Sequence, residues 1–192
     1  MFKLNEPFRD FIAFKEKEYA IDLSFDNVLE VLEVWNEETL EPELKLITSC
    51  SLLFGEDIIE QLIFEDLISI FELVRAEVFH GDELTEVYDQ LGNVMKKKEE
   101  KPDFSLEYDS EYIFTSFIQA YGINLQKEFG EMHWEEFRML LRDLPPDSKL
   151  NRVREIRNWK PSKNSTSEEI EQMRELQEIY ALPDSEMEGG ED

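Results

Sequence analysis

The spacing of the apolar residues changes once along this chain of 192 residues, near Ser24. Between Tyr19 and Leu23 the apolar residues alternate with polar or small ones, which is the period of a β-strand. Together with the short apolar run Phe11–Phe14, this predicts a small hairpin turning at Lys15–Lys17. After Ser24 the apolar residues recur every three or four positions, and the chain holds only 7 Gly and 7 Pro. The sequence therefore predicts a mainly α fold: a multi-helix orthogonal or bundle-like domain with a small N-terminal β-hairpin.

Residues typical of helix ends divide the helical part into segments. Ser24 or Asp26 can cap the first helix, Pro42 stands near the start of the second, and Gly55 and Gly122 fit C-terminal caps. The helices are expected at about 24–35, 42–54, 56–79, 84–91, 110–121, 133–142, 147–156 and 167–180. The third is expected to be the longest, with one continuous apolar stripe.

A charged segment suggests a division into two halves. Residues 96–103 begin with the run KKKEEKP, which has no apolar anchor and reads as a linker. We therefore expect an N-terminal half over 1–95, containing the hairpin, and a C-terminal helical half over 104–182. Residues 1–95 have a net charge of −17 and residues 96–192 of −9. The acidic residues 183–192 are expected to be a disordered tail.

The charge excludes several classes of protein. The chain has 46 acidic and 20 basic residues, a net charge of −26, so a direct nucleic-acid binder is not expected. The longest uncharged run has 15 residues, shorter than the roughly 20 of a membrane span, and the start MFKLNEPFRD lacks the apolar stretch of a signal peptide. Cys50 is the single cysteine, so no intramolecular disulfide can form. We expect a soluble protein of a reducing compartment, without a membrane partner.

The sequence contains no catalytic signature. The phosphate-binding loop, the dinucleotide fingerprint and the nucleophile elbow are all absent. His80 and His133 lie far apart, and neither has a second histidine at helical ligand spacing. Cys50 lies within a helix stripe and is interpreted as a small buried hydrophobe. We therefore expect no enzyme, no catalytic residue, no cofactor and no metal.

Two features remain as candidate partner sites. A basic strip over 149–163 has six cations against the single acid Glu155, a local charge of +5. It either pairs with the protein's own acids or docks an acidic partner or a second copy. The aromatic residues of 114–137 either fill the core or line a groove for an amphipathic partner helix. The six cations are Lys149, Arg152, Arg154, Arg157, Lys160 and Lys163, and the aromatics are Phe114, Phe117, Tyr121, Trp134 and Phe137.

The second half of the chain resembles a known family. The segments YIFTSFIQAYGI, HWEEF and IR–WKP occur in the order seen in small tail assembly chaperones of phages infecting Gram-positive bacteria. The resemblance spans about residues 103–182 and extends more loosely over 8–92. The matching motif residues are Tyr121, Gly122, His133, Trp134, Lys149, Arg157 and Lys160. Members are encoded between the major tail protein and the tape measure protein, and the family has no established catalytic residues.

The resemblance implies a function. It implies that the protein binds the tape measure protein and keeps it soluble during tail tube polymerisation, in the host bacterial cytoplasm, and that it is absent from the mature virion. The major tail protein and a second copy of the chain are further candidate partners. The partner-binding residues are expected among Tyr121, Trp134, Phe137, Lys149, Arg152, Arg157 and Lys160. The alternative is an acidic DNA mimic that inhibits a DNA-binding host protein, and steep salt dependence would distinguish it.

Overall fold

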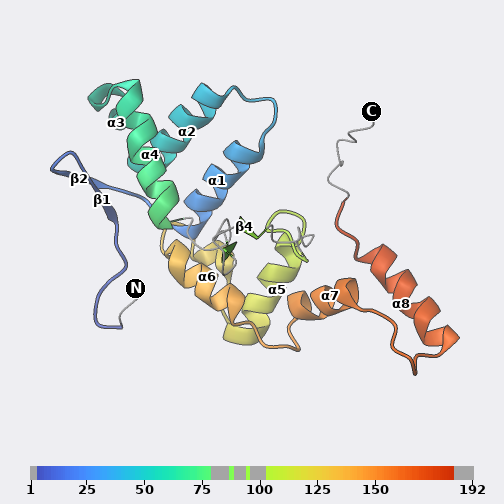
Figure 1. The fold of residues 1–192 in the computed structure, drawn as a ribbon. Helices are drawn as coiled ribbons and strands as arrows, with labels where there is room; N and C mark the ends of the chain where they lie inside the picture. The colour runs from blue at the N-terminus through green and yellow to red at the C-terminus, as the bar shows by residue number, and fades with distance from the viewer. Residues whose placement is uncertain (1–3, 79–86, 89–93, 96–102, 184–192) are drawn as a thin grey trace, which may run out of the picture. The chain divides into compact units, whose positions relative to one another are not determined.

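The computed structural model describes residues 4–78, 87–88, 94–95 and 103–183, and these are mainly helical (Figure 1). An antiparallel hairpin precedes the helices, which confirms the predicted fold class. The hairpin strands are β1 (Phe11–Phe14) and β2 (Lys17–Ala20). The helices are α1 (Phe25–Asn36), α2 (Pro42–Phe54), α3 (Asp57–Gln61), α4 (Phe64–Val78), α5 (Ser110–Tyr121), α6 (Trp134–Arg142), α7 (Lys149–Asn158) and α8 (Ser167–Ile179), with a 3-10 turn η1 at Leu125–Lys127.

The chain forms two compact units, and the second is not a simple continuation of the first. The first unit comprises Met1–Lys98 and Glu128–Met139, and the second comprises Glu99–Lys127 and Leu140–Asp192. From the sequence we placed Glu128–Met139 in the C-terminal half, but in the structure it packs with the N-terminal residues. The expected linker over 96–103 and tail over 183–192 lie almost entirely outside the described residues.

The hairpin turns where the sequence predicts, but with unusual residues. Lys15 and Glu16 have φ values of +48° and +62°, so both adopt the left-handed conformation of a two-residue turn. Asn-Gly is the usual choice there, because residues with a Cβ are strained at positive φ. Contacts outside the hairpin help to fix it: Lys15 Nζ lies 2.6 Å from Asp66 Oδ1, and Lys17 Nζ donates to Gln61 Oε1.

An aliphatic core holds the first unit together. Helix α2 packs against both α1 and α4. Cys50 is fully buried, with Sγ 3.9 Å from the Leu67 carbonyl, and burial raises the pKa of its thiol to about 12. This confirms its interpretation as a buried hydrophobe. The other side chains with no exposed surface include Val28, Val31, Ile70 and Val74.

The expected single helix over 56–79 is wrong. Helices α3 and α4 are separated at Leu62, whose backbone is extended with φ −120° and ψ 141°. Ile63, expected in the apolar stripe, is 64% exposed instead. The contacts from the hairpin reach residues on both sides of this break, at Gln61 and Asp66. The periodicity is locally compatible with one helix, but the packing of the hairpin favours two.

The expected helix over 84–91 is also wrong where the structure describes it. Val87–Tyr88 is the strand β3, which pairs antiparallel with β4 (Val94–Met95). The rest of that expected helix lies outside the described residues. Phe79, His80 and Gly81, which precede it, also lie outside them.

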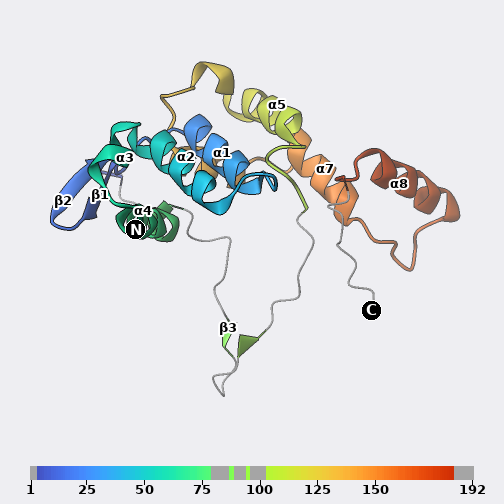
Figure 2. The ribbon, with the colours of Figure 1, turned by 90° about the horizontal axis from the view of Figure 1, so that it is seen from above.

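The second unit is built from α5, α7 and α8. Helix α7 lies between α5 and α8 in both views (Figures 1 and 2). Helix α5 ends as predicted at Gly122, which has a left-handed φ of +69°. Two helix starts differ by one residue from the expected ranges, which begin at 147 and 167: the caps are Ser148 for α7 and Thr166 for α8. Thr166 and Glu169 form a reciprocal capping box.

Candidate functional site

Trp134 and Phe137, two predicted partner-binding aromatics, lie in the core of the first unit. They are 6% and 2% exposed. The Phe137 ring stacks on Phe25 at 5.0 Å and on Trp134 at 5.6 Å. Trp134 N donates to the Leu23 carbonyl at 2.7 Å, which ties the start of α6 to the segment before α1. Their burial favours the core role over direct partner contact, which stays a prediction.

His133 contacts residues of the N-terminal segment and the first turn of α6. Its ring stacks on Phe8 at a centroid distance of 4.5 Å. Its Nδ1 accepts from Glu135 N at 3.1 Å, so the neutral ring carries its proton on Nε2, which lies 3.3 Å from the Arg9 carbonyl. Both nitrogens are therefore used in holding the start of α6.

Tyr121 closes the C-terminal end of α5. Its hydroxyl donates to the Leu140 carbonyl at 2.9 Å, and its ring meets Phe117 edge-on at 5.7 Å. Burial, together with the negative charge of Asp143, raises the pKa of Tyr121. The hydroxyl therefore stays a hydrogen-bond donor at neutral pH.

Arg157 is the centre of a buried polar framework in the second unit. Its side chain is 11% exposed and pairs with Asp109, which is 1% exposed, through contacts of 2.6 and 2.7 Å. It also donates to the carbonyls of Tyr180 at 2.6 Å and Asp103 at 3.0 Å. One guanidinium thus links the segment before α5, helix α7 and the end of α8. Sequence reasoning did not identify Asp109 as its partner, because 48 residues separate the two.

Lys149 and Arg154 are also engaged within the second unit. Lys149 Nζ lies over the rings of Tyr112 and Tyr180, at 5.2 and 4.8 Å, and contacts the Tyr180 hydroxyl at 3.1 Å. Arg154 pairs with Asp103 at 3.0 Å. Lys149, Arg154 and Arg157 of the basic strip therefore interact with the protein's own residues, as one of the two interpretations of the strip expects.

The other three cations of the basic strip are not engaged in this way. Arg152, Lys160 and Lys163 are exposed. Their side chains make no hydrogen bond or ion pair with the part of the chain that the structure describes. Only these three positions of the strip therefore remain available to a partner.

Helix α8 is held largely by polar contacts. It has no buried residue, although Ile170, Met173 and Tyr180 follow helical spacing. The Gln177 amide donates to carbonyls of Ile156, Arg157 and Trp159, and so satisfies the C-terminal end of α7.

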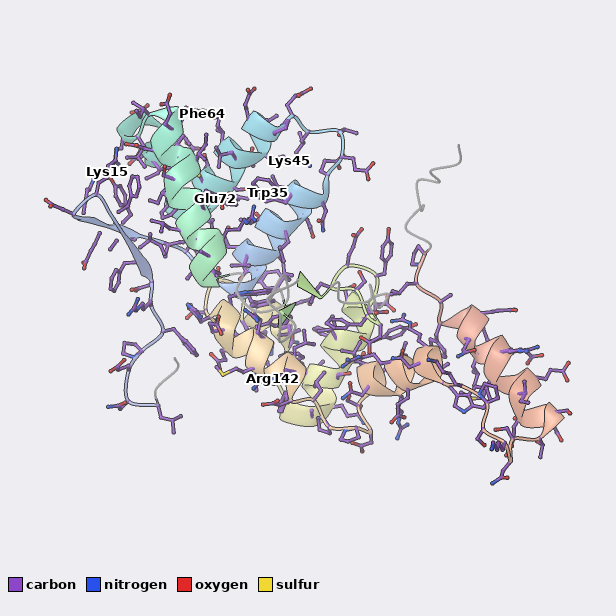
Figure 3. All side chains as sticks on the ribbon, viewed as in Figure 1. Lys15, Trp35, Lys45, Phe64, Glu72 and Arg142 are labelled. Atoms are coloured by element: carbon purple, nitrogen blue, oxygen red, sulfur yellow. The ribbon has the colours of Figure 1, made fainter. Side chains whose placement is uncertain are left out.

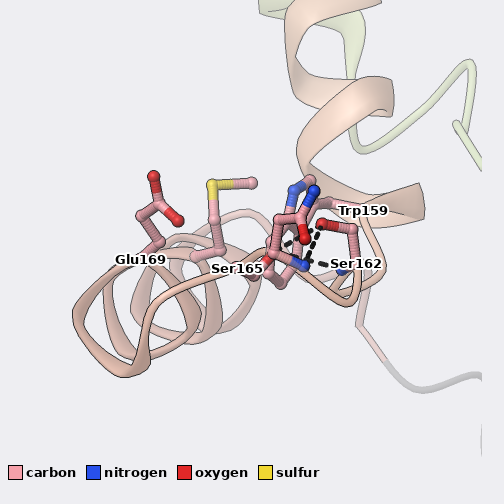
Figure 4. Close-up of a pocket in the computed structure, with 6 residues that line it drawn as sticks. Trp159, Ser162, Ser165 and Glu169 are labelled. Atoms are coloured by element: carbon pink, nitrogen blue, oxygen red, sulfur yellow. Dashed lines mark hydrogen bonds between the residues drawn. The ribbon is translucent and has the colours of Figure 1, made fainter.

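An open hollow of about 450 Å³ lies beside the first turns of α8 (Figure 4). Hydrogen bonds between Ser162 and Ser165 fix the loop on one side of it. The hollow is lined by Trp159, Ser162, Asn164, Ser165, Glu169 and Met173. Sequence reasoning missed it, although Trp159 stands in the motif IR–WKP.

A second surface feature lies in the first unit, at the start of α4. Ile63, Phe64 and Ile68 are 64%, 40% and 43% exposed. Figure 3 shows Phe64 at the beginning of this helix and Glu72 further along it. The expected continuous helix hid this feature, because it assigned Ile63 to the buried stripe.

Two further kinds of site, for metals and for membranes, concern the residues that the structure describes. Among them, no group of three or more His, Cys, Asp or Glu side chains is arranged to hold a metal ion. No helix in residues 4–78 or 103–183 has the length and apolar character needed to cross a bilayer.

Comparison with known proteins gives a family. The family described as "Bacteriophage Gp15 protein" matches residues 4–182, which is nearly the whole chain. No curated protein and no solved structure gave a significant match. The match includes both units and all the motif segments that the sequence comparison singled out. The chain therefore belongs to the Bacteriophage Gp15 protein family.

Proposed function

We propose that this protein is a bacteriophage tail assembly chaperone, which binds the tape measure protein and keeps it soluble while the tail tube polymerises. Membership of a phage family supports a role in the phage cycle. The observation that carries the proposal is the exposure of large apolar side chains on helices of a chain with net charge −26. Apolar surface can bind an aggregation-prone helix, and the acidic charge keeps the complex soluble.

Trp35 is the contact that we assign to the tape measure in the first unit. Its ring stacks on Phe71 at 5.1 Å and is held at the end of α1, yet it is 37% exposed. Lys45 Nζ donates to its carbonyl at 2.9 Å (Figure 3). A tryptophan fixed in this way offers a large apolar contact with little loss of side-chain entropy on binding.

Release requires that each contact be weak. Many copies along one long tape measure bind together by avidity, whereas each single copy is readily displaced by a tail tube subunit. We propose that binding takes place in the host cytoplasm and that the protein is absent from the finished tail. The major tail protein is the candidate that displaces it.

The test is co-expression of the tape measure from the same phage with this chain, in low and high salt. Soluble tape measure that co-purifies in both salts is the expected result, because burial of apolar surface does not weaken as charges are screened. Trp35→Ala should reduce the co-purified amount, whereas the exposed Leu44→Ala on α2 serves as the matched control. Insoluble tape measure with no complex in either salt would overturn the proposal.

The net charge of −26 keeps one alternative in view, an acidic mimic of DNA. Its complex with a DNA-binding host protein would dissociate steeply as salt rises, because exposed charges are screened. Binding to a DNA-binding protein in low salt alone, without any effect on the tape measure, would favour this alternative.

A further inference from the structure

Each of the two units has accessible apolar side chains, and the charged residues beside them differ. The α4 patch consists of Ile63, Phe64 and Ile68 in the first unit. The α8 surface consists of Trp159, Met173 and the hollow between them in the second, with Lys160 and Lys163 on the adjoining loop.

The α8 surface is a fixed site of mixed character: Trp159 and Met173 are its apolar side chains, and the other residues that line the hollow are polar or charged. Gln177 and Tyr180 anchor the C-terminal end of the helix to α7 through hydrogen bonds. Its position therefore depends little on burial of its apolar stripe, which leaves Ile170 and Met173 only half-buried. Tryptophan and methionine are side chains that adapt well to a helix partner.

The charges beside the α8 surface are basic on its loop side. Lys160 and Lys163 are exposed and make no ion pair with the described residues. By helical spacing, four of the five exposed acids of α8 fall on the face opposite its apolar stripe. These acids are Glu168, Glu171, Glu175 and Glu178. The α8 surface thus has two exposed lysines on its loop side, while Glu169, the fifth acid of α8, lines the hollow itself.

The α4 patch has the opposite character. Phe64 and Ile68 are four residues apart, so they lie on one face of the helix. Two exposed acids are close to them in the sequence: Glu60 precedes Phe64, and Glu65 lies between Phe64 and Ile68. The two lysines beside the α8 surface therefore suit it to bind apolar side chains that have carboxylates next to them.

We propose that the α4 patch of one copy binds the α8 surface of a second copy, in a head-to-tail contact. Phe64 and Ile68 would enter the hollow beside Trp159, and the neighbouring acids would meet Lys160 and Lys163. The two faces are different, so the contact is heterologous, and successive copies form a ring or an open chain. This inference does not rest on the proposed function, since it concerns the protein alone.

The experiment measures the mass of the purified full chain by light scattering over a wide range of concentration, in low and high salt. We expect the mass to rise with concentration. The two salts compare the attraction at the lysine edge with the repulsion between two chains of net charge −26, since salt screens both. A mass that stays monomeric at every concentration overturns the proposal.

Two variants separate the faces. Phe64→Ser with Ile68→Ser removes the α4 patch, and Lys160→Glu with Lys163→Glu reverses the edge of the α8 surface. Each is expected to weaken self-association by about tenfold or more, since like charges or lost apolar contact now face the partner. Leu44→Ser and Lys127→Glu are the matched controls, because both change exposed residues outside the two faces. Circular dichroism checks that each variant remains helical.

Mixing the two variants gives the sharpest outcome. Each retains one intact face, so an equimolar mixture is expected to form a dimer and nothing larger. A mixture that stays monomeric, or one variant that still associates by itself, overturns the head-to-tail contact. Neither result depends on the tape measure, so failure here and failure of the proposed function are distinguishable.

Discussion

The two units of this protein are stabilised in different ways. The first is held by fully buried aliphatic side chains, among them Val28, Ile70 and Val74. The second also has a small core, at Phe117, Leu150 and Val153, but depends on the polar framework around Arg157. The core of the first unit fixes its helices while side chains such as Trp35 and Ile63 stay exposed, whereas polar anchoring fixes α8 although none of its residues is buried. The second unit can therefore offer a binding site without losing its structure.

The largest expected effect tests the polar framework. Asp109→Ala leaves the Arg157 guanidinium buried without its carboxylate, which should cost about 3–5 kcal/mol. Hydrogen exchange should rise in α5, α7 and α8. Replacing both partners together, by Asp109→Leu with Arg157→Met, should recover part of the loss, because no unpaired charge is then buried, although the carbonyls of Tyr180 and Asp103 lose their donor. If the single and double variants are equally unstable, the charge pairing is not what matters there.

The next effect tests the aliphatic core of the first unit. Ile70→Ala should lower the free energy of unfolding by about 2–5 kcal/mol, through lost burial and the cavity left behind. Ile68→Ala is the matched control on the same helix, since Ile68 is 43% exposed and Ile70 is 0% exposed. Denaturant unfolding of both variants at low concentration measures the difference. Equal losses would show that α4 does not present these two faces differently.

A smaller effect tests how α8 begins. Thr166→Ala removes the side chain that accepts from Glu169 N, and should cost about 1 kcal/mol of local helix stability. We expect faster hydrogen exchange over the first turn of α8, with no change near Tyr180, where separate contacts hold the helix. Ser167→Ala is the control, because Thr166 and not Ser167 is the cap. An effect of Ser167→Ala as large as that of Thr166→Ala would contradict this assignment.

The smallest effect is a gain, in the hairpin of the first unit. Glu16 has a φ of +62°, so Glu16→Gly should relieve strain and stabilise the turn by about 0.5–1 kcal/mol. Glu18→Gly, within β2, should destabilise the hairpin, since a strand gains nothing from glycine there. Thermal unfolding of the two variants compares them directly, and a loss of stability in both would rule out strain at the turn.

Local sequence signals were sufficient for much of the fold. Pro42 and Gly55 bracket α2, and Gly122 ends α5, because these residues restrict or permit backbone angles by themselves. The candidate site was harder to predict from the sequence. The sequence identified the basic strip as a unit, but it could not show that Arg157 reaches Asp109, or that Lys149 reaches Tyr180, across 48 and 31 residues.

The sequence by itself determined the fold class, most helix ends and the excess of acid, since these depend on composition, periodicity and local backbone preference. Tertiary structure decided the rest. The helix break at Leu62, the burial of Trp134 and Phe137, and the division of the basic strip into paired and available cations all depend on contacts between distant residues. A periodic pattern shows that a side chain is suited to a core, but only packing determines which apolar side chains are covered and which remain exposed.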